Sequence, residues 1–159
     1  MNFKGDTYGV ITKKGAKDLI TELQSYFNNS SNVFYDLGSA NGDLLLYVNE
    51  MTNLKSITGI ELHKERYENS LKKITNSPRI SLINKDFIQV DLSNANIVYL
   101  DNTAIPKDIC NQLFQNLPKD CLLIACRRIK CSYMSDYKKT NPIEKDYAKS
   151  YSNWYITIK

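Results

Sequence analysis

The ten residues from Val33 to Gly42 constrain this chain more than any other part of it. They read Val-Phe-Tyr-Asp-Leu-Gly-Ser-Ala-Asn-Gly, an apolar strand followed by a short loop with two glycines, and Asp43 then opens a helix. In α/β proteins a strand, a glycine-rich turn and a helix N-terminus together bind nucleotide-like ligands. Gly38 and Gly42 let the backbone approach a ligand where a Cβ would collide. The exposed N–H groups of the first helical turn then face that ligand.

Three further predicted strands also end in polar side chains. Ile57–Glu61 ends in an acid 25 residues after Asp36, Ile80–Phe87 ends in an acid and an aromatic residue, and Ile97–Asn102 ends in Asp-Asn. Open α/β sheets bind ligands at the carboxyl ends of their strands, where an acid near this offset accepts hydrogen bonds from ribose hydroxyls. Each acid alone is typical of a helix cap or a solvated loop. The four together, in this order, favour a ligand site.

The loop sequence also indicates the class of ligand. It lacks the full G-x-G-x-x-G pattern that a pyrophosphate cofactor usually requires, and acids stand on both sides of it, at Asp36 and Asp43. Carboxylates at these positions repel phosphate and suit a cationic ligand. S-adenosylmethionine carries a sulfonium and an ammonium but no phosphate, so the loop favours this compound over a dinucleotide.

With these segments in place, the chain resembles a class I S-adenosylmethionine-dependent methyltransferase. More narrowly, it resembles the non-SET lysine methyltransferases of the disruptor-of-telomeric-silencing type and their small archaeal and viral-like relatives. The resemblance extends from about Tyr8 to Ile158. It rests on short segments spread along the chain: Tyr8-Gly9-x-x-Thr12, Tyr35–Ser39, Gly59–Glu61, Asp86-Phe87, Leu100–Asn102 and Ser152–Trp154.

The resemblance implies a Rossmann-like class I methyltransferase fold, an α/β fold with a mostly parallel seven-stranded sheet and helices on both faces. The alternation of strands and helices independently predicts a parallel sheet with right-handed crossovers. We expect a single domain over residues 1–159, in which residues 1–32 form a cofactor-covering segment and a helix. The family adds a last antiparallel strand.

Hydrophobic periodicity and turn residues predict the individual elements. We expect helices at 13–28, 43–52 and 64–75, and a further helix from Pro106 to about Asn116. We expect strands at 33–36, 56–61, 79–84, 96–100, 121–126 and 154–158. The polar region 127–150 has no pattern that predicts a helix or a strand. The helix at 13–28 is amphipathic, and its predicted buried face is Ala16, Leu19, Ile20, Leu23 and Phe27.

The resemblance implies S-adenosyl-L-methionine as cofactor, S-adenosyl-L-homocysteine as product and no metal. Glu61 would bind the ribose hydroxyls, and Asp86 would accept a hydrogen bond from the adenine amino group beside Phe87. Asp36 and Gly38 would shape the methionine pocket. The full set of expected cofactor-binding residues is Thr12, Asp36, Gly38, Ser39, Ala40, Gly42, Glu61, Leu62, Asp86, Phe87 and Asn102.

The expected reaction needs positioning more than acid–base chemistry. Methyl transfer from a sulfonium is an in-line displacement with an activated leaving group, so alignment dominates. A lysine nucleophile, with a free pKa of about 10.4, must first lose its proton, and desolvation beside a sulfonium lowers that pKa. By resemblance, the catalytic residues would be Asn102 at the target nitrogen, Tyr8 in the covering loop together with Thr12, and Trp154 as a wall of the substrate channel.

Three functions are considered for the sequence. We rank first a methyltransferase acting on a lysine side chain of a protein, with histones and nucleic-acid-associated proteins among the expected substrates. An inactive S-adenosylmethionine-binding accessory module ranks second, because Ala40 stands where the family usually has glycine and Asp101–Ala104 replaces an Asn-Asn-aromatic run. An RNA or DNA base methyltransferase ranks third. Exocyclic-amine enzymes carry a Pro-Pro-aromatic turn after the fourth strand to hold the base, and Asp101–Ala104 has neither proline nor an aromatic residue.

Composition restricts the partners and the compartment. The net charge of the 159 residues is only +4, which is too low for a dense nucleic-acid-binding surface. The sequence has no apolar stretch of about 20 residues, so we expect no membrane partner. The four cysteines form no C-x-x-C pair, which favours free thiols over a zinc site. We therefore expect a reducing intracellular location, cytoplasmic or nuclear. The oligomeric state is left open.

Overall fold

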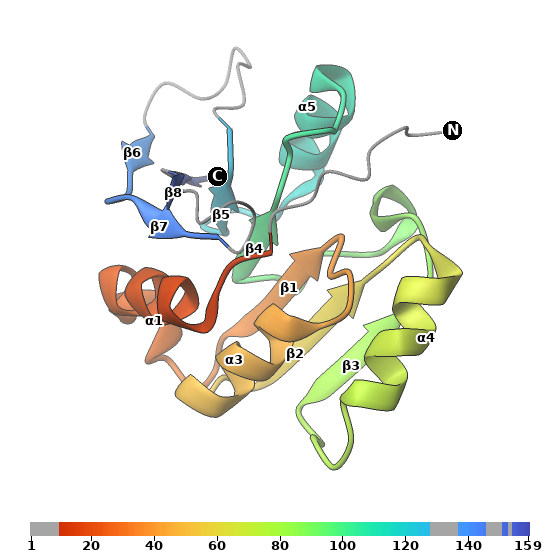
Figure 1. Ribbon diagram of the computed structural model, residues 1–159. Coiled ribbons are helices and arrows are strands. Elements are labelled where there is room, and N and C mark those ends of the chain that lie inside the picture. The colour runs from red at the N-terminus through yellow and green to blue at the C-terminus, as the bar shows by residue number, and fades with distance from the viewer. Residues whose placement is uncertain (1–9, 128–136, 146–150, 153) are drawn as a thin grey trace.

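The computed structural model describes residues 10–127, 137–145, 151–152 and 154–159. Its centre is a seven-stranded sheet with the order β3-β2-β1-β4-β5-β9-β6 (Figure 1). β1 to β5 run parallel, β9 is antiparallel to β5, and β6 is antiparallel to β9. The bounds are β1 Val33–Leu37, β2 Ser56–Ile60, β3 Ile80–Ile83, β4 Ile97–Leu100, β5 Leu122–Ala125, β6 Lys138–Lys139 and β9 Tyr155–Ile158. A separate antiparallel pair consists of β7 Ile143–Glu144 and β8 Tyr151–Ser152.

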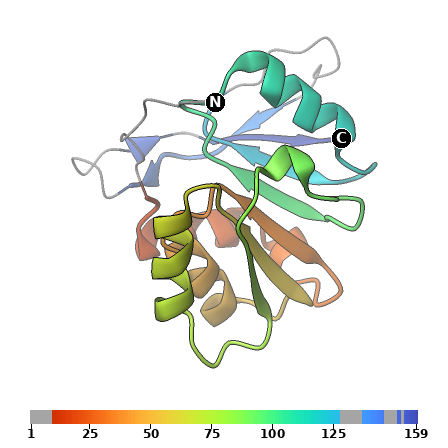
Figure 2. The ribbon, with the colours of Figure 1, turned by 90° about the vertical axis from the view of Figure 1, so that its right-hand side faces the viewer.

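Helices cover both faces of the sheet. α1, α3 and α4 lie on one face, and α5 lies with the short 3-10 helix η1 on the other (Figures 1 and 2). The bounds are α1 Lys13–Glu22, α2 Gln24–Phe27, α3 Asp43–Met51, α4 Lys64–Lys73, η1 Phe87–Gln89 and α5 Lys107–Asn116. None of the helices in the described part of the chain is long and apolar enough to span a membrane.

The core lies in two layers because the strands are buried on both faces. Side chains of a strand alternate between its two sides, so Phe34 packs with α1 and α3 while Tyr35 packs with α5. All five residues of β1 and all four of β4 are buried. Such continuous burial is typical of parallel strands in the middle of an α/β sheet.

The predicted fold class is confirmed, and the antiparallel strand expected at the end of the chain is β9. One predicted helix is wrong in its extent. The segment 13–28 forms two helices, because Leu23 leaves the helical region with φ −109° and ψ 28°. The predicted apolar face is nevertheless buried throughout. The break lets Phe27 pack against Phe34, with ring centroids 6.0 Å apart.

The start of α1 contacts the β7–β8 pair, which lies in and beyond the region that received no assignment from sequence. The backbone N–H of Thr12 donates to the carbonyl of Glu144 over 3.1 Å, and Ile11 pairs with Lys145 in an isolated antiparallel bridge. A Cβ on Gly15 would lie 2.3 Å from the Glu144 carbonyl oxygen. Glycine at this position therefore permits the close approach of the helix to β7.

Candidate functional site

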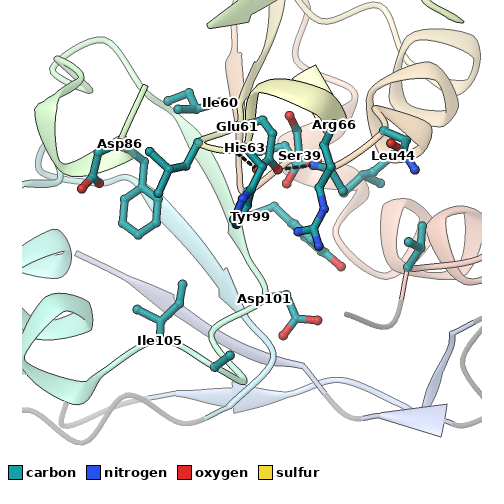
Figure 3. A pocket seen from close by; sticks show the side chains of 18 of the residues that line it. Ser39, Leu44, Ile60, Glu61, His63, Arg66, Asp86, Tyr99, Asp101 and Ile105 are labelled. Atoms are coloured by element: carbon teal, nitrogen blue, oxygen red, sulfur yellow. Dashed lines mark hydrogen bonds between the residues drawn. The ribbon is translucent and has the colours of Figure 1, made fainter. Parts of the chain in front are cut away.

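A cavity of about 410 Å³ opens at the carboxyl ends of the parallel strands (Figure 3). β1 lies between β2 and β4. From β1 the chain adds β2 and then β3 on one side of β1, and it then crosses to add β4 and β5 on the other side. Ligands of open α/β sheets bind in the crevice at such a switch point. Of the cofactor-binding residues predicted from sequence, those that line the cavity are Asp36, Gly38, Ser39, Ala40, Glu61, Leu62, Asp86 and Phe87.

The glycine loop after β1 has a left-handed backbone at three alternate positions. The φ angles are +84° at Gly38, +47° at Ala40 and +79° at Gly42. For a non-glycine residue this conformation costs about 1–2 kcal/mol. Ala40 occupies it where the resembled family usually has glycine, so the departure noted in the sequence has a conformational cost. Gly42 does not line the cavity; a Cβ there would lie 2.7 Å from the Cδ1 of Ile74.

Glu61 ties the glycine loop to the loop after β2. Its side chain is buried, with one carboxylate oxygen accepting from the N–H of Ala40 and the other from the N–H of His63, both over 2.8 Å. The first of these bonds holds Ala40 in its left-handed conformation. A carboxylate offers about four acceptor positions, so Glu61 keeps acceptor capacity toward the cavity. Its predicted contact with ribose hydroxyls stays a prediction.

Two buried polar atoms at the cavity have no hydrogen-bond partner within the described residues. They are the hydroxyl oxygen of Ser39 and the amide oxygen of Asn41, and both residues line the cavity. Buried polar groups are almost always satisfied, and each exception needs an explanation. A polar ligand in the cavity would supply the missing partners, which is the fit expected for an amino-acid-like group.

Asp36 also lines the cavity and is buried, with the acids Glu61 and Asp101 nearby. Burial, together with the charges of Glu61 and Asp101, raises the pKa of Asp36 to about 8. Tyr99, which also lines the cavity, has the pKa of its hydroxyl raised by burial and by the charges of Asp36, Asp101 and Cys126. Binding a cation would stabilise the ionised carboxylate of Asp36. The electrostatics around Asp36 therefore favour a positively charged group of a ligand.

The raised pKa of Asp36 gives a pH dependence of stability. Between its unfolded pKa near 3.8 and its folded pKa of about 8, the folded state holds a proton that the unfolded state has released. The contribution of Asp36 to the free energy of unfolding is therefore fully present below the unfolded pKa and is lost as the pH rises through the folded pKa of about 8. We expect the melting temperature of the ligand-free protein to fall from about pH 5 to about pH 8. Calorimetric melts should show a flatter profile for Asp36→Asn; identical profiles for the two proteins would contradict the assignment.

Another wall of the cavity follows β3. The carboxylate of Asp86 caps η1 by accepting from the N–H of Ile88 over 3.0 Å, and Phe87 and Ile88 line the wall. Figure 3 shows Asp86 and Asp101 on different walls, with Glu61 and Tyr99 between them. A flat aromatic group fits between such apolar side chains, and an acid at the edge can accept from an amine.

The predicted catalytic residues lie differently from the expectation. Asn102 does not line the cavity, and its amide brackets the backbone of Arg127 by donating to the carbonyl over 2.9 Å and accepting from the N–H over 2.7 Å. Its neighbour Asp101 lines the cavity instead. Trp154 is fully buried in the core, with its ring 4.6 Å from that of Tyr99 between centroids. Neither Asn102 nor Trp154 faces the cavity directly.

The N-terminal residues predicted to contact the cofactor were Thr12 and Tyr8. Thr12 caps α1 by accepting from the N–H of Gly15 over 3.0 Å, and it does not line the cavity. Val10 and Ile11 do line it. Tyr8 lies outside the described residues. Val10 and Ile11 are two adjacent apolar residues just before Thr12, the N-cap of α1. This pattern in the sequence could have identified them as a buried wall.

Asp101 is the functional candidate that the sequence underrated. One carboxylate oxygen accepts from the ammonium of Lys145 over 2.9 Å; the other accepts from the hydroxyl of Thr103 over 2.6 Å and from its N–H over 3.1 Å. Burial alone would raise the pKa of Asp101, but Thr103 and Lys145 outweigh it and hold this pKa below the usual value. Asp101 is therefore ionised at neutral pH. Further lining residues that the sequence did not single out are Arg66, Lys85, Tyr99, Ala104, Ile105 and Ile109.

The side chains of the described residues form no cluster of three or more histidines, cysteines or acids able to hold a metal ion. Cys110, Cys121 and Cys126 are buried free thiols. Burial raises the pKa of Cys121 to about 12. Cys121 is thus a hydrophobic core residue rather than a nucleophile.

Comparison with known proteins places this geometry in context. No family model matches the chain. A protein-lysine N-methyltransferase from Saccharolobus islandicus (strain REY15A) is 29% identical over 73 residues, which are 44% of this chain and 45% of that protein. The chain thus matches less than half the length of this relative.

Solved structures match over nearly the whole chain. An RNA methyltransferase from Salinibacter ruber, in complex with S-adenosyl-L-homocysteine, has a TM-score of 0.69 at 19% identity and covers 94% of this chain and 93% of its own. M. jannaschii TYW2, in complex with AdoMet, has a TM-score of 0.62 at 15% identity and covers 96% of this chain and 76% of its own. The chain therefore has the Rossmann-like fold of the class I methyltransferases.

Proposed function

We propose that this protein transfers a methyl group from S-adenosylmethionine to the side-chain nitrogen of a lysine in a protein substrate. The observation that carries the proposal is the acid-lined cavity at the switch point. It combines the buried acid Asp36 with the unpartnered polar atoms of Ser39 and Asn41. A ligand with a sulfonium, an ammonium and a carboxylate would give Asp36 a cation and give Ser39 and Asn41 polar partners.

The proposal assigns each part of the cofactor to the end of one strand. In the order β3, β2, β1, β4, the lining residues after each strand would take the adenine, the ribose, the methionine end and the acceptor. Asp86 and Phe87 would hold the base, Glu61 the ribose hydroxyls, and Asp36 the cationic methionine end. Asp101 would then border the acceptor nitrogen. When bound, S-adenosylmethionine supplies an activated methyl group on sulfur.

The residues around Asp101 suit an amine acceptor. Ala104 and Ile105 after β4 and Ile11 from the N-terminal segment give an apolar wall there. An apolar wall disfavours an ammonium and so lowers the pKa of an entering lysine. Asp101, whose charge Lys145 offsets over 2.9 Å, would orient the amine by accepting a hydrogen bond, and the exclusion of water would prevent competing reactions. The activity printed for the Saccharolobus islandicus relative, protein-lysine N-methylation, is consistent with this assignment.

Two observations weigh against the other candidate functions. The strained Ala40 is held in place by Glu61 over 2.8 Å, so the loop geometry survives the missing glycine; this favours an active enzyme over an inert accessory module. The Salinibacter ruber neighbour is an RNA methyltransferase, yet Asp101–Ala104 provides no aromatic platform for a flipped base. RNA is therefore the alternative acceptor that the experiment must include.

The test is transfer of a labelled methyl group to a panel of acceptors. Purified protein is incubated with labelled S-adenosylmethionine and histones, lysate protein or RNA, and mass spectrometry locates the label. We expect the label on lysine side chains of protein and none on RNA. Label on RNA alone would contradict the lysine assignment, and S-adenosylmethionine binding without any transfer would favour the accessory module.

A further inference from the structure

Lys145 is a buried lysine that has no role of its own in the proposed function. It directly follows β7, and only 6% of the residue is exposed. Its ammonium lies 2.9 Å from the carboxylate of Asp101, 3.1 Å from the sulfur of Cys126 and 5.0 Å from the ring centroid of Trp154. Lysines are almost never buried unless they are paired. The pairing with a cavity-lining acid places Lys145 directly behind the site.

The backbone of Lys145 contacts a second wall of the cavity. It pairs with Ile11 in an antiparallel bridge, and the preceding carbonyl, of Glu144, accepts from the N–H of Thr12 over 3.1 Å. Ile11 itself lines the cavity. One residue therefore connects Asp101, at the end of β4, with the N-terminal segment that borders the same space.

We infer that Lys145 is a positioning residue for methyl transfer: its ammonium pairs with Asp101 and fixes that carboxylate at the acceptor end of the cavity. The inference rests on the proposed function. Lys145 acts through Asp101 and does not line the cavity itself. Its bridge to Ile11 fixes the facing wall at the same time, so the acceptor nitrogen meets two surfaces with a defined separation.

The charges around Asp101 explain why a cation is needed there. The titratable groups close to it are Asp36 from β1, Tyr99 from β4 and Lys145 after β7, and Cys126 after β5 contacts the ammonium of Lys145. Without the ammonium, Asp101 would be a partly buried acid close to the buried acid Asp36, and its carboxylate would be destabilised. Burial lowers the pKa of Lys145, but Asp101 and Cys126 outweigh this and raise it, so the ammonium stays charged.

The test compares Lys145→Met, which keeps the aliphatic stem without the charge, with Lys145→Arg, which keeps the charge. Lys159→Met is the matched control. The ammonium of Lys159 also lies over an aromatic ring, 5.5 Å from the centroid of Phe114, but it bonds backbone carbonyls away from the cavity. Each variant is measured for kcat, for the Kd of S-adenosylmethionine, and for the titration of the Asp101 carboxyl by carbon-13 NMR.

For Lys145→Met we expect kcat to fall by about tenfold or more, because misplacement of a positioning group slows a reaction that depends on alignment. The pKa of Asp101 should rise by about one unit or more on loss of the neighbouring positive charge. The Kd should stay within about threefold, since Lys145 does not line the cavity. Lys145→Arg should keep most of the rate, and Lys159→Met should match the wild type.

An unchanged kcat in Lys145→Met would overturn the inference: with a shifted Asp101 titration it would leave Lys145 a purely structural ion pair, and with a wild-type titration it would remove the pairing as well. If Lys145→Met does not fold, Lys145→Gln carries the same measurements. Failure of the proposed function is distinguishable: the wild type would then transfer no methyl group to any acceptor. In that case an unshifted Asp101 titration in the variant would still overturn the pairing role.

Discussion

The Glu61→Ala variant is expected to remain folded and to lose about a hundredfold or more in affinity for S-adenosylmethionine. Glu61 is buried and holds the N–H groups of Ala40 and His63. Hydrogen bonds to a charged group contribute about 1.5–3 kcal/mol each, so two lost ribose contacts account for that change. Isothermal titration calorimetry measures the affinity, and circular dichroism verifies the fold.

Glu65→Ala is the matched control, because Glu65 is an exposed acid in the first turn of α4, four residues away. It should bind S-adenosylmethionine as the wild type does. An affinity of Glu61→Ala within about threefold of the wild type would remove Glu61 from the binding site. Its carboxylate would then serve only to connect the two loops.

Replacement of Trp154 by alanine is expected to have the largest effect on stability, a loss of about 3–5 kcal/mol in the free energy of unfolding. The side chain is fully buried, stacks near Tyr99 and lies under the ammonium of Lys145. Trp154→Phe should lose much less, because the indole N–H has no hydrogen-bond partner within the described residues. Denaturant unfolding of the three proteins measures both differences.

The same pair of variants decides between a core role and the channel-wall role predicted from sequence. If Trp154 is a core residue, Trp154→Ala lowers the stability, and Trp154→Phe leaves the KM for a protein acceptor unchanged. A raised KM in Trp154→Phe, with near-normal stability in Trp154→Ala, would instead support a wall of the substrate channel.

Local sequence signals predicted the half of the site that follows β1 and β2. The strand, the glycine loop and the helix start are adjacent in the chain, so one short pattern determines their geometry. Glu61 was predictable because a strand that ends in an acid delivers it to the ligand edge of a parallel sheet. The left-handed conformation of Ala40 could not be predicted, since it depends on a carboxylate 21 residues away.

The end of β4 shows where such reasoning stops. Asp101 and Asn102 are adjacent, and successive side chains point to opposite sides. The sequence alone does not say which of the two faces the cavity. The choice follows from the segment after β5, because the amide of Asn102 brackets the backbone of Arg127. The prediction named Asn102, whereas the residue that lines the cavity is its neighbour Asp101.

Non-local contacts account for the rest of what the sequence did not predict. β7 and β8 have two residues each, which is too short for any periodic pattern to be recognised. Lys145 follows β7 in a polar stretch of the sequence, where a lysine would be expected to be exposed to solvent. It is buried because Asp101, 44 residues earlier, supplies its counter-ion. Such pairings become visible only when the strands are placed in space.

Calorimetric titration of the wild-type protein with S-adenosylmethionine, in parallel with ATP, tests the central claim most directly. Both ligands carry adenosine, but one is cationic and the other carries phosphates, so the comparison isolates the acid-lined end of the cavity. The predicted result is one-to-one binding of S-adenosylmethionine with a micromolar Kd and much weaker binding of ATP. No measurable binding of S-adenosylmethionine, or tighter binding of ATP, would contradict the account.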